Sequence, residues 1–149
     1  MKAIVLVSAA LLFTTAAHAG EFDPAAGEKV FKKCLTCHAV GPAAKNKVGP
    51  ILNGVVGRDM GSIEGFNYSK GREGTLMEVA KAGDGVWTYA NLDAYLTNPK
   101  DLVPKGKMAF AGLKNETERH NVIAYLASHD LEGNTVDPVP VMKAAGKPD

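Results

Sequence analysis

The stretch Cys34-Leu35-Thr36-Cys37-His38 is the most informative part of this sequence. A C-x-x-C-H run is the attachment signature of c-type haem. The two thiols would form thioether bonds with the haem vinyl groups, and the ring of His38 would supply a nitrogen ligand to the iron. The pattern therefore predicts one haem c, covalently bound through Cys34 and Cys37, with His38 as a metal ligand.

Two other kinds of site also use a C-x-x-C pair. A thioredoxin-like disulfide is expected after a strand in a βαβ pattern, and no such pattern is visible here. A structural zinc site needs four ligands, whereas the chain has only two cysteines and no pair of histidines follows at finger spacing. Haem attachment is favoured over both, which stay open as alternatives.

The first 19 residues have the pattern of a secretory signal peptide. Met1-Lys2 gives a positive start, the run from Ala3 to Phe13 is apolar, and Ala17-His18-Ala19 is an A-x-A cleavage site. The apolar run is shorter than the roughly 20 residues that span a bilayer. We expect cleavage after Ala19 and a soluble, periplasmic mature protein.

The rest of the chain divides into a domain and a tail. Residues 20–131 are enough for one small domain. Residues 132–149 contain Pro138, Pro140 and Pro148, and we expect an irregular C-terminal extension. The formal net charge is +1, and removal of Lys2 with the leader would make the charge balance neutral, which argues against a nucleic-acid partner.

Capping signals predict four helices. Their N-caps are Asp23, followed by Pro24 at the first helical position, and then Thr75, Thr88 and Asn115. The first three helices are expected to end near Lys33, at Gly83 and at Asn98-Pro99, and the fourth carries the apolar stripe of Val122, Ile123, Tyr125 and Leu126. Glu118 lies three residues after Asn115, which is the spacing of a capping box. Residues 39–75 are rich in glycine and lack helical periodicity, so this long segment is expected to wrap around the haem.

Several spaced motifs agree at once with a known family. Besides Cys34 to His38 they are Gly49-Pro50, Gly57-Arg58, Gly65-Phe66-Asn67-Tyr68, Trp87, Leu92 to Pro99, Lys107 to Gly112 and Ile123-Ala124-Tyr125-Leu126. Over residues 23–131 the chain resembles a class I cytochrome c, most like the bacterial cytochrome c2 type. The resemblance implies an all-α, small cytochrome c fold, with several short helices and long loops wrapped around one covalently bound haem.

The resemblance also implies a set of site residues. His38 and Met108 would be the two iron ligands, and the Pro50 carbonyl would accept the other ring N–H of His38. Hydrogen bonds to a haem propionate would come from Arg58, Tyr68 and Trp87, because a buried carboxylate needs donors. Tyr95 should pack near Met108. Gly27 and Tyr125 should mark the crossing of the first and last helices of the domain.

One position departs from the family pattern. The family usually has a hydroxyl residue two positions before the methionine, where this chain has Gly106. Glycine loosens the loop, and our hypothesis is that Lys105 or Lys107 displaces Met108 more easily at high pH.

Ligation by histidine and methionine would close both axial positions of the iron. The expected function is then one-electron, outer-sphere transfer by a soluble carrier rather than an enzyme. The alternative is a haem enzyme or ligand sensor with a labile distal site, of a peroxidase-like kind.

The resemblance also implies partners for such a carrier. It would shuttle between a cytochrome bc complex and a terminal oxidase, reaction centre or reductase, touching membrane-bound complexes only transiently. A lysine-rich face at the haem edge would contact these redox proteins, through Lys33, Lys47, Lys100 and Lys107, and the carrier would be a monomer.

Overall fold

The structure is a computed structural model that describes residues 22–148. These residues form six helices: α1 (Pro24–Phe31), α2 (Leu76–Ala82), α3 (Tyr89–Thr97), α4 (Pro99–Leu102), α5 (Glu116–Ala127) and α6 (Pro138–Ala144). Within this part of the chain there is no β-strand, only two isolated bridges, Asp59 with Val86 and His129 with Thr135. The expected all-α class is confirmed, and the expected leader, 1–19, lies outside the described residues.

The helices begin where short polar side chains bind free backbone N–H groups. The side chains of Asp23, Thr88 and Asn115 accept hydrogen bonds from Ala25, Asn91 and Glu118 at 2.8, 3.1 and 3.0 Å, respectively. These contacts satisfy donors that the first helical turn leaves unpaired. Helix α2 follows Thr75, but without a side-chain cap bond.

Two local details differ from the expectation. The capping box at α5 is half formed, because the Glu118 carboxylate pairs with Lys33 at 2.8 Å, and so bridges α5 to the end of α1. Pro99 ends α3 as expected, yet it also occupies the first turn of the short α4. Proline suits that position because its missing N–H would have no partner there.

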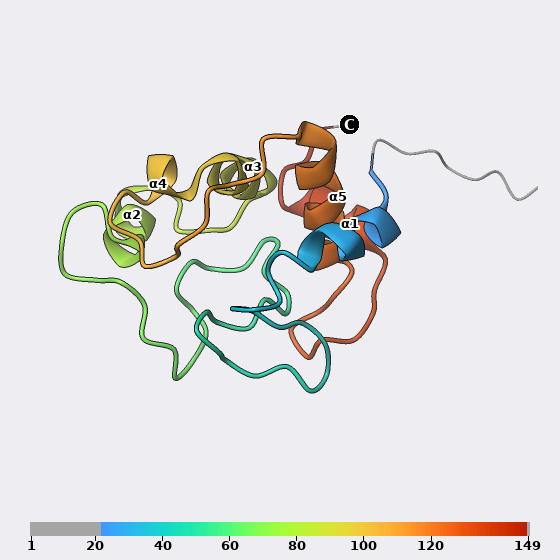
Figure 1. Ribbon diagram of the computed structural model, residues 1–149, viewed down its shortest axis with the longest axis horizontal. Helices are drawn as coiled ribbons and strands as arrows, with labels where there is room; N and C mark the ends of the chain where they lie inside the picture. Colours follow the sequence, from blue (N-terminus) through green and yellow to red (C-terminus); the bar gives the residue numbers. More distant parts are fainter. Residues whose placement is uncertain (1–21, 149) are drawn as a thin grey trace, which may run out of the picture.

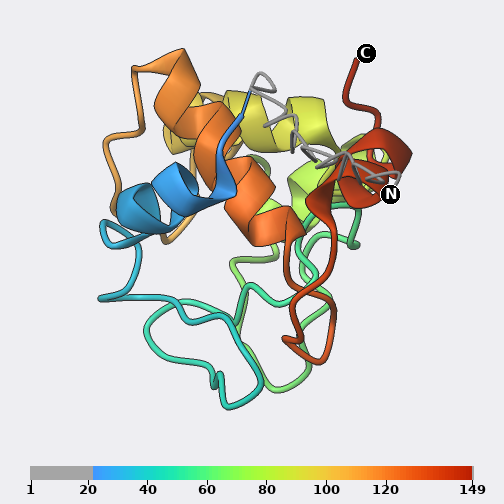
Figure 2. The same ribbon diagram turned by 90° about the vertical axis from the view of Figure 1, so that its right-hand side faces the viewer.

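Helices α1 and α5 cross in direct contact, as Figures 1 and 2 both show. A Cβ atom on Gly27 would lie 2.0 Å from the carbonyl oxygen of Asn121 and 2.8 Å from the Cβ atom of Tyr125. The Asn121 side chain also accepts from the Asp23 N–H at 2.6 Å. The expected crossing at Gly27 and Tyr125 is therefore present, and the close approach requires glycine.

Long connections occupy the other side of the molecule. Residues 32–75 contain no helix or strand, and both views show them as loops lying below the layer of helices (Figures 1 and 2). Several of their glycines, Gly54 and Gly57 among them, have positive φ angles, so the tight turns suit glycine. The expectation of a long irregular segment between α1 and α2 is confirmed.

The C-terminal extension is not irregular throughout, and this corrects the sequence-based expectation. Residues Pro138–Ala144 form α6, which begins at an Asp137 cap and contacts α5. Its Met142 is only 1% exposed, and the Ala145 carbonyl accepts from the Tyr89 N–H at 2.9 Å. Prolines at the start of a helix are tolerated, and burial of Met142 favours the docked helix.

Within residues 22–148, none of the helices combines the length and the apolar character needed to cross a membrane.

Candidate functional site

The Cys34–His38 segment continues from the end of α1 in tight turns. The N–H of Cys34 donates to Phe31, and the N–H groups of Cys37 and His38 both donate to the Cys34 carbonyl, at 2.7, 3.0 and 2.9 Å. Both cysteines are free thiols and partly exposed. Burial raises the pKa of the Cys34 thiol, although Lys33 opposes the effect. The segment therefore presents two unpaired thiols and one imidazole within five residues.

The imidazole of His38 is fixed by its neighbours. Its Nδ1 atom lies 2.7 Å from the Pro50 carbonyl oxygen. A carbonyl only accepts, so Nδ1 carries the hydrogen and Nε2 keeps a free lone pair. Burial lowers the pKa of His38, which favours the neutral ring that metals bind.

Gly49 is a site residue whose contact with the ring the sequence did not reveal. A Cβ atom on Gly49 would lie 2.3 Å from Cε1 of His38. Any side chain there would push the ring away, so glycine lets the loop bring the Pro50 carbonyl to Nδ1. The available signal was the position of Gly49 in the Gly49-Pro50 motif.

Met108 lies in the irregular segment between α4 and α5. The Tyr95 hydroxyl donates to the Met108 sulfur at 3.6 Å, so the expected proximity of the two residues is present. The Tyr95 ring also packs against Trp87, with ring centroids 4.9 Å apart. Burial raises the pKa of Tyr95 to about 12, which keeps its hydroxyl protonated and able to donate. Tyr95 thus links the Met108 thioether to the buried core.

Arg58, Tyr68 and Trp87 come from three parts of the loop region. The Arg58 guanidinium donates to the carbonyls of Asn53 and Ile51, and burial lowers its pKa while Tyr68 opposes that shift. Arg58 and Trp87 are joined by the backbone, since the Trp87 N–H donates to the Arg58 carbonyl at 2.8 Å. The structure therefore brings the three expected propionate donors into one region.

One atom in that region lacks a partner. The Nε–H group of Arg58 is buried and has no hydrogen-bond acceptor among the described residues. An unpaired buried donor costs about 1–3 kcal/mol, and more when the group is charged. A carboxylate of a bound group would satisfy it, which is the fit expected for a haem propionate.

Asn53 is a second residue that the sequence did not single out. Its side-chain amide is buried, and it both donates to and accepts from the backbone of Gly41, at 3.1 and 2.9 Å. The backbone carbonyl of Asn53 also accepts a hydrogen bond from the Arg58 guanidinium. Asn53 thus ties the chain after His38 to the Arg58 region, and its only sequence signal is a polar residue within the apolar run 51–56.

The four lysines of the expected partner face differ in their contacts. Lys33 pairs with Glu118. Lys47 donates to the carbonyls of Leu35 and His38, at 2.7 and 3.3 Å. Lys100 donates to the Gly106 carbonyl and Lys107 to the Asn67 carbonyl. Three of the four therefore bind neutral carbonyls, which orients the ammonium groups without neutralising them.

Gly106 has little room for a side chain. A Cβ atom there would lie 3.1 Å from both Cγ1 and the carbonyl oxygen of Val103. The glycine at this departure from the family pattern therefore matches the close packing of the loop against Val103.

No protein-family model matches the chain. It is 54% identical to a cytochrome c-550 of Ancylobacter novellus over 110 residues, which cover 74% of this chain and 98% of the relative. It is 49% identical to a cytochrome c2 of Rhodomicrobium vannielii over 130 residues, 86% of this chain and 97% of the relative.

Solved structures agree with these relatives. The fold is similar to a cytochrome c2 from Rhodospirillum centenum with a TM-score of 0.63 and 42% identity, over 72% of this chain and 98% of that one. The expected small cytochrome c fold is thus confirmed. The chain belongs to the class I cytochrome c family, among the bacterial cytochromes c2, which are electron carriers and not enzymes.

Proposed function

We propose that this protein is a periplasmic electron carrier that holds one haem c through Cys34 and Cys37. His38 and Met108 are the proposed iron ligands. The bound haem supplies a one-electron redox centre, and the chain supplies its attachment, its ligands and its surroundings. Family membership supports the electron-carrier role, and the C-x-x-C-H spacing supports the attachment.

The observation that carries the proposal is that both candidate ligand side chains are held by a second group. The Pro50 carbonyl orients the His38 ring at 2.7 Å, and the Tyr95 hydroxyl contacts the Met108 sulfur at 3.6 Å. Such partners orient ligands and tune their basicity. Two ligands held in place favour electron transfer with little rearrangement, and they leave no free position for a substrate.

In this proposal, three side chains supply hydrogen-bond donors to the haem carboxylates. Arg58 supplies the unpaired, buried Nε–H group. The Tyr68 hydroxyl accepts from the Ile63 N–H at 3.3 Å, so its own hydrogen stays available to a carboxylate. Trp87 packs beside Tyr95, and we assign its indole N–H to the same role.

The proposed redox partners follow from the positive charge of four lysines. Lys33, Lys47, Lys100 and Lys107 would form a positive face that attracts acidic surfaces of redox proteins, with a cytochrome bc complex as donor and an oxidase, reaction centre or reductase as acceptor. Electrostatic steering speeds encounter at low salt, and small electron-transfer interfaces release quickly. A monomer, exported after cleavage at Ala19, fits this shuttle role.

The test is the visible spectrum of the protein matured in a bacterial periplasm, in the oxidised and reduced states. We expect a low-spin haem with the weak sulfur-to-iron band in the oxidised state. Met108→Ala should abolish that band, whereas Met77→Ala, at a methionine on α2, should keep it. A high-spin haem in the unmodified protein would contradict the proposal and favour a haem enzyme or sensor.

A further inference from the structure

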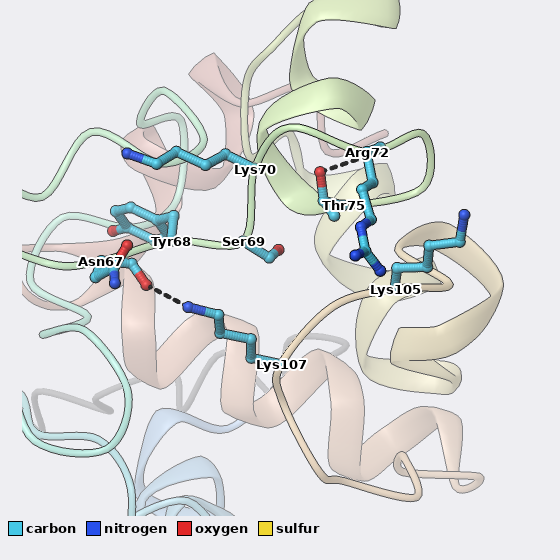
Figure 3. Close-up of a pocket in the computed structure, with 8 residues that line it drawn as sticks. All are labelled: Asn67, Tyr68, Ser69, Lys70, Arg72, Thr75, Lys105 and Lys107. Atoms are coloured by element: carbon cyan, nitrogen blue, oxygen red, sulfur yellow. Dashed lines mark hydrogen bonds between the residues drawn. The ribbon is translucent and has the colours of Figure 1, made fainter.

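The stretch 107–112, which we call the Met108 segment, has few hydrogen bonds of its own. It lies between α4 and α5, outside any helix, and none of its backbone N–H groups donates to another backbone group within residues 22–148. At its start, the Lys107 ammonium donates to the Asn67 carbonyl at 3.1 Å (Figure 3). A segment with so few backbone hydrogen bonds opens locally at low cost, so its position depends on how its ends are held.

The C-terminal end of the Met108 segment is held against the end of α3. The Leu113 N–H donates to the Leu96 carbonyl at 2.7 Å, and the Lys114 ammonium donates to the Thr97 carbonyl at 2.8 Å. A Cβ atom on Gly112 would lie 2.1 Å from that Thr97 carbonyl oxygen, so the two stretches of backbone approach as closely as glycine permits. The chain that leaves the segment therefore has a fixed place on α3.

Arg119, on α5, also binds this end of the segment. Its Nη1 atom donates to the carbonyls of Leu113 and Lys114, at 3.1 and 3.2 Å. Its Nε atom donates to the carboxylate of Asp93, on α3, at 2.6 Å. Arg119 is only 8% exposed, and the rigid fork of its guanidinium lets one side chain serve all three acceptors. Arg119 therefore joins α3 and α5 to the end of the Met108 segment.

Asp93 keeps the guanidinium in that place. Its carboxylate accepts a charge-assisted hydrogen bond, which is stronger than a neutral one, and no other carboxylate pairs with Arg119 within residues 22–148. The His120 imidazole lies 3.9 Å from the same oxygen, so Arg119 is the closer partner. Without Asp93, Arg119 would be a buried charge with no counter-ion, and it would turn toward water and away from the two carbonyls.

We propose that Asp93 and Arg119 are positioning residues that hold the Met108 segment against α3 and so keep Met108 in place as an iron ligand. Breaking their ion pair should raise the fraction of molecules in which the segment is displaced. An external ligand that needs the position of the sulfur then binds with an apparent affinity that rises in proportion to that fraction. The effect on the iron rests on the proposed ligation by Met108, whereas the anchoring of Leu113 does not.

The experiment is a titration of the oxidised, haem-loaded protein with imidazole at pH 7, followed by loss of the weak sulfur-to-iron band. Asp93→Asn keeps the shape of the side chain but removes its charge, and it should raise the apparent affinity for imidazole roughly tenfold, since a hydrogen bond to a charged group contributes about that factor. Arg119→Lys keeps the charge but lacks the fork of donors, so it should raise the affinity as well. The matched control is Glu118→Gln, which also turns a carboxylate of α5 into an amide and breaks the ion pair with Lys33. It should change the affinity by less than about twofold, because exposed ion pairs contribute little.

A second control separates positioning from a general loss of stability. Met142→Ala removes a buried side chain of α6, far in sequence from the Met108 segment, and should leave the imidazole affinity unchanged while it destabilises the fold. Hydrogen exchange of the Leu113 N–H should be roughly tenfold faster in Asp93→Asn. An imidazole affinity that Met142→Ala or Glu118→Gln raises as much as Asp93→Asn, or an unchanged Leu113 exchange rate, would overturn the proposal. Tight imidazole binding by the unmodified protein would instead refute the ligation by Met108, and the Leu113 exchange rate tells the two failures apart.

Discussion

Replacing Gly27 by alanine should destabilise the protein, although the same change in most helices has the opposite effect. In an exposed helix interior, glycine to alanine adds about 1 kcal/mol of stability. Here the new Cβ atom would lie 2.0 Å from the carbonyl oxygen of Asn121, whereas nonbonded atoms prefer about 3.5 Å. Helices α1 and α5 would have to separate by roughly 1.5 Å, given that preferred distance.

The expected size follows from two opposing effects. Overpacking of a close interface costs about 1–3 kcal/mol and occasionally more. The clash is with backbone, which cannot rotate away, so we place the cost at the upper end. After the gain in helix propensity, the net loss should be about 2 kcal/mol.

Urea unfolding of the haem-loaded protein, followed by far-ultraviolet circular dichroism, measures this loss. The midpoint should fall while the slope stays constant. Glu28→Ala, at the next and exposed position of α1, is the matched control and should stay within about 0.5 kcal/mol. If Gly27→Ala is as stable as the unmodified protein, the argument for a glycine-dependent crossing is wrong.

Three further changes test other contacts. Tyr95→Phe removes the hydrogen bond to the Met108 sulfur, so the sulfur should donate more electron density to the iron. The reduction potential should therefore fall by the equivalent of about 1 kcal/mol, and an unchanged potential in a redox titration would contradict this. Burial, with Glu28 nearby, raises the pKa of Tyr125 above 10, so its contribution to stability is complete below pH 10 and is lost as the pH rises through the raised value. Tyr125→Phe should therefore flatten the fall of unfolding free energy above pH 10, and an identical pH profile would refute the assignment. Met142→Ala should cost about 2–5 kcal/mol because the side chain is fully buried; thermal unfolding that is unaffected would show that α6 does not hold the fold.

Local signals predicted the helix starts well. Asp23, Thr88 and Asn115 act on N–H groups two or three residues away, so the information lies within one turn of sequence. The expected N-terminal capping-box role of Glu118 failed because a distant residue, Lys33, competes for its carboxylate. Such competition depends on the tertiary fold and leaves no trace in the local sequence.

Helix α6 shows the same limit more clearly. Pro138 and Pro140 suggested an irregular tail, and helix propensity alone agrees with that expectation. The helix forms because Met142 and Ala145 are buried against the rest of the protein, which is information that only the folded chain contains.

The site residues divide in a similar way. The roles of Pro50, Arg58, Tyr68, Trp87, Tyr95 and Met108 came from resemblance, whereas the contacts of Gly49 and Asn53 came from the structure. Both missed residues act on backbone or ring atoms about 11 or 12 positions away, His38 and Gly41. Contacts between loop residues 11 or 12 positions apart follow no periodic pattern, so the sequence does not reveal them.

Exposure of the reduced, haem-loaded protein to carbon monoxide tests the central claim most directly, because this gas binds ferrous haem only where a ligand position is open. The proposed ligation by His38 and Met108 predicts an unchanged visible spectrum at neutral pH. Met108→Ala should bind the gas readily, which shows that the assay detects an open position. Rapid binding to the unmodified protein would contradict the electron-carrier account and favour an enzyme or sensor.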